Sequence, residues 1–227
     1  MNYLALCQRV VQEAGITGGG PTTVENQSGQ LAKVVGWVQQ AWTDIQLMRD
    51  NWNFMQEEFT FNTVAATRDY LAADYSITDM KLWDTGSFLI YETALGESDQ
   101  NELRYKTYGR WRDEHRNRMN DRPDERPQLF TLMSNNKVRF EPRPDKEYTI
   151  DGDYKRSSQE FTANTDVPTN LPDDFHMIIV WQALKYCGFY EDAPDVLDEA
   201  ETNFDNLLLR LEIEQLPEFS EDYKALA

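Results

Sequence analysis

The sequence predicts an α+β protein. Helix pairs at the N- and C-terminal ends form a helical bundle, and an antiparallel β domain is inserted between them. Apolar residues recur at helical spacing near both ends of the chain, and the pattern changes to alternation in the middle. The predicted parts are a bundle of residues 1–53 and 171–216, a β-rich insert of residues 54–170 with a short helix near 106–117, and a C-terminal tail of residues 217–227.

The first helix pair occupies the N-terminal region. Apolar residues at helical spacing predict one helix from about Asn2 to Ala14, and Gly15 is suited to end it because glycine tolerates left-handed backbone geometry. A second helix begins near Ser28, and its apolar stripe continues to Trp52, which predicts a helix of about six turns.

The middle of the chain is predicted to form strands. Residues 59–63 alternate as a strand does, and residues 70–77 suggest another extended piece. Residues 81–83 and 88–91 flank a glycine-containing loop, which predicts a hairpin. The short helix is expected to start at Leu103 and run to about Asn117.

Three further runs predict a three-stranded antiparallel meander or a pair of hairpins. These runs are residues 128–133, 138–142 and 148–154, with Asn135-Asn136 as a turn between the first two. The next segment, residues 161–170, is rich in Thr and Asn. It is interpreted either as an arm that reaches a neighbouring copy or as an ordinary surface loop.

The second helix pair follows this segment. Leu171-Pro172-Asp173-Asp174-Phe175 begins a helix to about Tyr190, because the two aspartates favour a helix N-terminus. A last helix starts near Asp195 and ends by Pro217, which cannot continue it. Its apolar stripe consists of Ala200, Phe204, Leu207, Leu208 and Leu211.

Charge is unevenly distributed along the chain, whose net charge is −18. Residues 191–227 contain 12 acidic and 2 basic residues, whereas residues 103–156 contain 14 of the 22 basic residues. A chain with this net charge is expected to avoid free DNA phosphates. Because acidic and basic residues lie in different regions, the chain is also suited to head-to-tail contacts between copies. No apolar run reaches the ~18–20 residues of a membrane helix, and no signal peptide is visible.

The candidate catalytic residues are few. The two histidines, His115 and His176, do not have the spacing of a metal pair, and no Gly-x-Ser-x-Gly motif occurs. Cys7 and Cys187 fall on or beside apolar stripes and are predicted to be reduced core residues. We therefore predict no cofactor, no metal and no enzymatic activity. The best acidic cluster, which could hold Mg²⁺ or act as an acid/base pair, consists of Asp145, Glu147, Asp151 and Asp153.

Arginines cluster in and after the predicted short helix. They could form a nucleic-acid patch, but interleaved acids dilute the positive field. A protein–protein zone that faces the acidic C-terminal region of another subunit fits the whole chain better. The candidate inter-subunit residues are Arg110, Arg112, Arg116 and Arg118, with Arg122 as a further member of the cluster.

Four short sequence patterns, none of which is a catalytic signature, occur in a particular order along the chain. They are residues 3–10 with the helix that ends at residues 50–55, Leu103-Arg104-Tyr105 leading into Trp111-Arg112, residues 126–130, and residues 171–175 followed by two helices. In this order and spacing the chain resembles the head-to-tail adaptor proteins of tailed bacteriophages, including the tail-tubular-protein-A-like adaptors.

The resemblance implies a structural virion protein in the neck between capsid and tail. It implies a homo-oligomeric ring of twelve copies that docks on the portal protein, extends the DNA channel and forms a platform for tail or nozzle proteins. DNA passes through the lumen without specific binding, and no membrane is involved. The C-terminal segment is implied to grip the portal, and the candidate portal contacts are Pro217, Phe219, Tyr223 and Leu226.

The sequence leaves three other functional hypotheses open. The protein could be a tail terminator or a head-completion protein, which is also a ring but docks elsewhere. It could be a metal-dependent hydrolase or nuclease built on the Asp145–Asp153 cluster. It could also be an acidic DNA mimic, which predicts tight binding to a basic enzyme and no ring.

Overall fold

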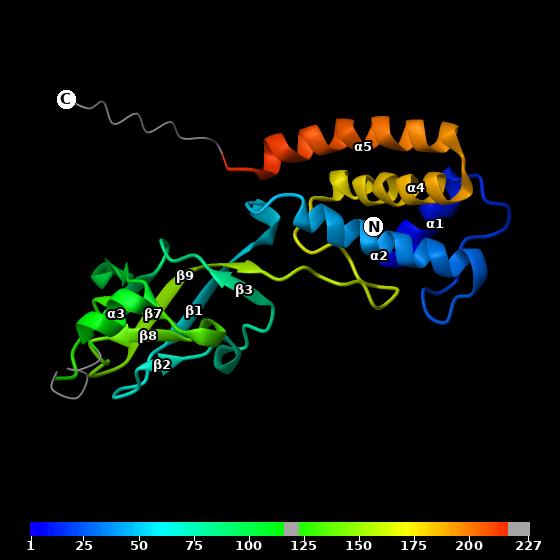
Figure 1. Cartoon of the computed structure of the whole chain (residues 1–227). Coiled ribbons are helices and arrows are strands. Elements are labelled where there is room, and N and C mark those ends of the chain that lie inside the picture. The colour runs from blue at the N-terminus through cyan, green and yellow to red at the C-terminus, as the bar shows by residue number, and fades with distance from the viewer. Residues whose placement is uncertain (116–122, 218–227) are drawn as a thin grey trace, which may run out of the picture. The chain divides into compact units, whose positions relative to one another are not determined.

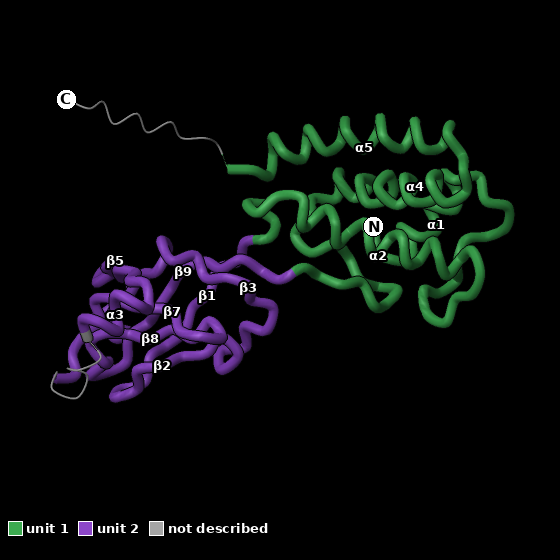
Figure 2. Tube along the Cα trace, in the orientation of Figure 1, with its two compact units in different colours: residues 1–55, 158–227 green, residues 56–157 purple. Residues whose placement is uncertain are grey.

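The chain divides into two compact units in the computed structural model, which describes residues 1–115 and 123–217. The helical unit comprises residues 1–55 and 158–227, and the β unit comprises residues 56–157 (Figure 2). Helices dominate the first unit and two sheets dominate the second, so the predicted α+β class is confirmed.

A central helix organises the helical unit. α4 (Met177–Glu191) packs against α5 (Pro194–Gln215), and also against α1 (Tyr3–Glu13) and α2 (Gly29–Leu47), which contact each other (Figure 1). Because α4 has neighbours on several sides, apolar residues surround most of its axis instead of forming one narrow stripe. Its buried residues are Ile178, Ile179, Val180, Gln182, Ala183, Leu184, Cys187 and Gly188.

α2 is shorter than its apolar stripe predicts. The helix ends at Leu47, and the chain turns at Asp50 and Asn51, which are residue types that favour turns. Trp52 then packs back on the helix, and its indole Nε1 donates a hydrogen bond to the carbonyl of Ile45 at 2.9 Å. The stripe therefore continues into the core of the unit after the helix itself has ended.

Residues 158–170 form part of the helical unit. Phe161 is buried and stacks on Tyr3 and Trp42, with ring centroids 4.9 and 5.9 Å apart. The backbone N–H of Tyr3 also donates to the carbonyl of Asp166 at 2.7 Å. These contacts place the unit boundaries after residues 55 and 157, whereas the sequence pattern suggested boundaries after residues 53 and 170.

β9 (Tyr148–Arg156) is the central strand of the first sheet in the β unit. β1 (Gln56–Asn62) pairs antiparallel along one edge, with Glu58 opposite Asp153. β4 (Leu89–Glu92) and β3 (Met80–Trp83) pair antiparallel with opposite ends of β9 along its other edge. The short strand β5, residues 101–102, extends the sheet beyond β4.

The second sheet has the order β2-β8-β7-β6. Its strands are β2 (Asp69–Tyr70), β8 (Val138–Glu141), β7 (Leu129–Leu132) and β6 (Arg104–Tyr105). All pairs are antiparallel except β6 with β7, which is parallel. Both sheets contribute side chains to one aromatic-rich core, which includes Phe59, Phe61, Trp83, Phe88, Ile90, Phe130, Phe140, Tyr148 and Ile150.

Four local predictions in the β unit are wrong. Residues 81–83 and 88–91 do not form the predicted hairpin, because each run pairs with β9. Only the β7–β8 hairpin of the predicted meander forms, because β9 joins the other sheet. Residues 103–105 contain strand β6, and the helix α3 (Tyr108–His115) starts after them; Tyr75 lies in a short 3₁₀ turn. Alternation identifies a strand and its buried face, but it does not identify the partner strand.

Candidate interaction surfaces

α3 presents two of the predicted inter-subunit arginines. Trp111 is 1% exposed and anchors the helix to the β unit, and the guanidinium of Arg139 lies 5.1 Å from its ring centre. Arg110 and Arg112 are exposed on the same helix, and Arg112 lies 3.9 Å from the carboxylate of Asp113. The other predicted members, Arg116, Arg118 and Arg122, lie outside the described residues.

Most other cationic side chains of the β unit are paired within that unit. Arg139 binds Asp69 through two nitrogen–oxygen contacts of 2.6 Å. Further pairs are Arg126–Asp99, Arg143–Asp124, Lys146–Glu92, Lys106–Glu114 and Arg68–Glu141. In contrast, Arg104 and Arg110 are exposed and form no ion pair with another described residue. Much of the basic cluster seen in the sequence is thus neutralised inside the fold, and these two arginines remain available to a partner.

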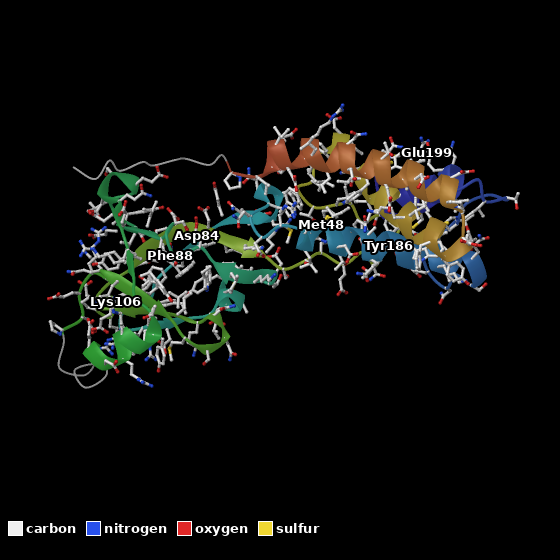
Figure 3. All side chains as sticks on the ribbon, turned by 45° about the horizontal axis from the view of Figure 1, so that its top comes forward. Met48, Asp84, Phe88, Lys106, Tyr186 and Glu199 are labelled. Carbon is white, nitrogen blue, oxygen red and sulfur yellow. The ribbon has the colours of Figure 1, made fainter. Side chains whose placement is uncertain are left out.

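A recess of about 500 Å³ lies beside Arg104 along the edge strands of the β unit. The segments around β6 and β7 meet there, because Arg104 pairs with Leu129 and its N–H donates to the carbonyl of Gln128 at 3.2 Å. The recess is lined by Ile90, Asn101, Glu102, Arg104, Lys106, Arg126, Pro127, Gln128 and Leu129. Figure 3 labels Lys106 on this unit.

The recess was not predicted from the sequence. Two of the short sequence patterns that support the family resemblance, residues 103–105 and 126–130, meet in this recess. Nothing in the two patterns taken separately shows that they are neighbours, because their contact depends on the parallel pairing of β6 with β7. Both patterns support the same family resemblance, and this was the one indication in the sequence that they share a role.

Negative charge is concentrated in the helical unit. This unit contains 20 acidic and 6 basic residues, a formal charge of −14, whereas the β unit contains 20 acidic and 16 basic residues, a formal charge of −4. On the outward face of α5, exposed acids occupy the first turns, among them Glu199 (Figure 3). Nearer the end of α5, Leu209 and Ile213 are 60% and 76% exposed.

Two members of the predicted acidic cluster form hydrogen bonds with other side chains of the β unit. Asp145 accepts a hydrogen bond from the hydroxyl of Tyr148 at 2.8 Å, and Glu147 accepts one from the amide of Asn62 at 2.7 Å. Among the side chains that the structure describes, no group of three or more His, Cys, Asp or Glu residues is arranged to hold a metal ion.

Asp151 and Asp153 lie on the face of β9 that points away from the core. Burial, together with the nearby charges of Asp84 and Glu58, raises the pKa of Asp153 above its usual value. This environment disfavours the charged form, because burial separates the carboxylate from water and because like charges lie nearby, such as that of Glu58 on the adjacent strand. Asp153 thus contributes repulsion with Asp84 and Glu58 to this face of the sheet.

His176 and both cysteines are buried in the helical unit. The Nε2 of His176 contacts the carbonyl of Leu171 at 3.2 Å, its Nδ1 contacts the amino group of Met1, and burial lowers its pKa. Cys7 and Cys187 are free thiols, as predicted. Burial raises the pKa of Cys7 to about 12 and raises that of Cys187 as well. Both thiols therefore remain protonated near neutral pH, which makes them poor nucleophiles.

The described chain ends at Pro217, which is exposed. Phe219, Tyr223 and Leu226, the other predicted portal contacts, lie outside the described residues.

The described residues thus present an uneven charge, two arginines without an ion pair among them, an edge recess and an exposed helix face, which are features of surfaces that bind other macromolecules. Comparison with protein-family models shows the family. The model described as SU10 adaptor protein matches residues 1–221, and the chain belongs to this family. It is a structural adaptor protein of a bacteriophage. A search of curated proteins gave no match. Among the described helices, none is long and apolar enough to span a membrane.

Proposed function

We propose that the protein forms a ring-shaped head-to-tail adaptor in the neck of the virion. The ring, of twelve copies, docks on the portal, extends the DNA channel and provides the platform to which the phage tail attaches. The observation that carries this proposal is the family match, which covers residues 1–221. The role is structural, and we expect no substrate turnover.

The charge distribution supports a conduit for DNA. A channel through which DNA moves must not retain phosphates, and carboxylates on its wall repel the duplex. The helical unit has the charge for this role, since each copy carries a formal charge of −14 there. Repeated around a ring, this charge would keep the duplex mobile.

Contacts within the ring and to the portal are assigned to different parts of the chain. The proposed inter-subunit contacts are Arg110, Arg112, Arg116 and Arg118, which would meet acidic residues of a neighbouring copy. The proposed portal contacts are Pro217, Phe219, Tyr223 and Leu226 in the C-terminal tail. Apolar side chains in a short segment are suited to insert into a groove of a partner.

Mixing the full chain with the portal protein of its phage tests the proposal. We expect ring-shaped particles on the portal in electron micrographs. A chain that lacks residues 218–227 should lose stable attachment while its far-UV circular dichroism is unchanged, and the matched variant Ser220→Ala should still attach. Attachment of the truncated chain would refute the assignment of the C-terminal tail. A full chain that ignores the portal and binds the phage tail end would instead support a tail terminator or head-completion protein.

A further inference from the structure

The recess in the β unit is lined by apolar residues and by an arginine that has no ion pair with a described residue. Pro127 and Ile90, which are buried, and the half-buried Leu129 are its apolar lining residues. Arg104 is exposed at the recess and forms no ion pair with a described residue, whereas Arg126 is held by Asp99. A matching partner therefore needs apolar side chains flanked by acidic ones.

α5 has such a surface near its C-terminal end. The inward face of the helix packs on α4 through residues such as Phe204 and Leu211. Leu209 and Ile213 lie one helical turn apart on the outward face and are 60% and 76% exposed, so the helical unit does not use them in its own core. Together they form a small exposed apolar patch on this face of the helix, which contact with a partner would bury.

Acidic residues flank this apolar pair. Asp205 lies one turn before Leu209, and Glu214 follows Ile213; both acids are exposed. The one base on this part of the helix, Arg210, is exposed as well, and the recess supplies an acid of opposite sign in Glu102. The exposed charges on this part of α5 are thus opposite in sign to Arg104 and Glu102 at the recess.

We propose that the C-terminal half of α5 from one copy of the chain docks in the β5–β6 recess of the next copy. Leu209 and Ile213 contact the apolar lining residues, and Glu214 or Asp205 pairs with Arg104. This inference rests on the proposed ring and specifies one of its subunit contacts. The two surfaces are different parts of the chain, so the contact is heterologous, and a heterologous contact closes into a ring when its rotation allows it.

Cross-linking between variants that each carry one added cysteine tests the contact. Leu209→Cys and Gln128→Cys place thiols on the helix and at the recess, and both native cysteines are buried. Under mild oxidation the mixture should give a covalent dimer, either alone or on the portal. The matched control Glu199→Cys lies in the first turns of the same helix, and its mixture with Gln128→Cys should give at least about tenfold less dimer.

Charge reversal gives a second readout. Arg104→Glu and Glu214→Lys should each weaken association between copies about tenfold, and a mixture or double variant that restores opposite charges should recover it. The control Lys81→Glu changes an exposed lysine elsewhere in the β unit by the same amount and should have little effect. Far-UV circular dichroism checks that every variant is folded.

Either of two results overturns the inference. One is a ring that forms on the portal without any cross-link between positions 209 and 128. The other is self-cross-linking of Leu209→Cys alone, which would mean that two α5 helices meet each other. Both results leave the proposed adaptor function intact, whereas a chain that never attaches to the portal refutes that function independently.

Discussion

Phe161→Ala tests whether residues 158–170 are part of the helical core. The ring of Phe161 is buried and lies between Tyr3 and Trp42, 4.9 and 5.9 Å away by ring centroids. Truncation of a buried Phe to Ala costs about 3–5 kcal/mol in lost burial and in the cavity that remains. A typical domain has a total stability of about 5–15 kcal/mol, so this loss is a large fraction.

Urea unfolding followed by far-UV circular dichroism measures this effect. The signal reports mainly on the helical unit, because that unit contains the four long helices of the described chain. Val167→Ala is the matched control: Val167 lies in the same segment, is 47% exposed, and should change the free energy of unfolding by less than about 0.5 kcal/mol. If Phe161→Ala costs no more than this control, the segment does not contribute to the core, and the interpretation as an arm to a neighbouring copy regains support.

Three further predictions concern packing and titration. Gly152→Ala should lower the free energy of unfolding of the β unit by about 1–3 kcal/mol, because its new Cβ would lie 2.9 Å from the ring of Phe59; urea titration with hydrogen exchange of the strands measures this. The pKa of Asp153 is raised in the folded state, so the stability that it contributes is present at low pH and is lost as the pH rises through that pKa. Asp153→Asn should therefore stabilise the protein at pH 7 by roughly 0.2–1 kcal/mol, because the neutral amide avoids the cost of burying a charge and the repulsion from Asp84 and Glu58, and should lose this advantage below the unfolded pKa; unfolding curves across pH that show no such trend contradict the reasoning. Cys7, whose pKa is raised to about 12, should resist a thiol reagent in the native protein and react fully after unfolding; rapid native labelling would mean that the site opens.

The terminal helices were predictable from the sequence because helical periodicity is local. Val34, Val38 and Trp42 recur within one helix, and all are buried where the pattern predicted. The turn at Asn135 and Asn136 was predictable for the same reason, since both residues adopt positive φ, at 64° and 56°. Each of these features depends on residues only a few positions apart.

Contacts between distant residues were decided by the tertiary structure. Phe59 alternates with polar neighbours, and this alternation predicted a strand with one buried face. Nothing in it indicated that Phe59 would lie opposite Gly152 on β9. Likewise, Arg139 and Arg104 look alike in the sequence, but only the fold shows that Arg139 is neutralised by Asp69 while Arg104 remains exposed at the recess.

The sequence by itself therefore determined the presence of the terminal helices, the longer strands and the uneven distribution of charge, because each depends on a local pattern or on composition. Strand partners, the place of residues 158–170 and the candidate surfaces were decided only in three dimensions. The physical reason is that pairing and burial join residues that are far apart in the chain, such as Glu58 and Asp153. Such partners are selected by the packing of the whole core, which no short segment encodes.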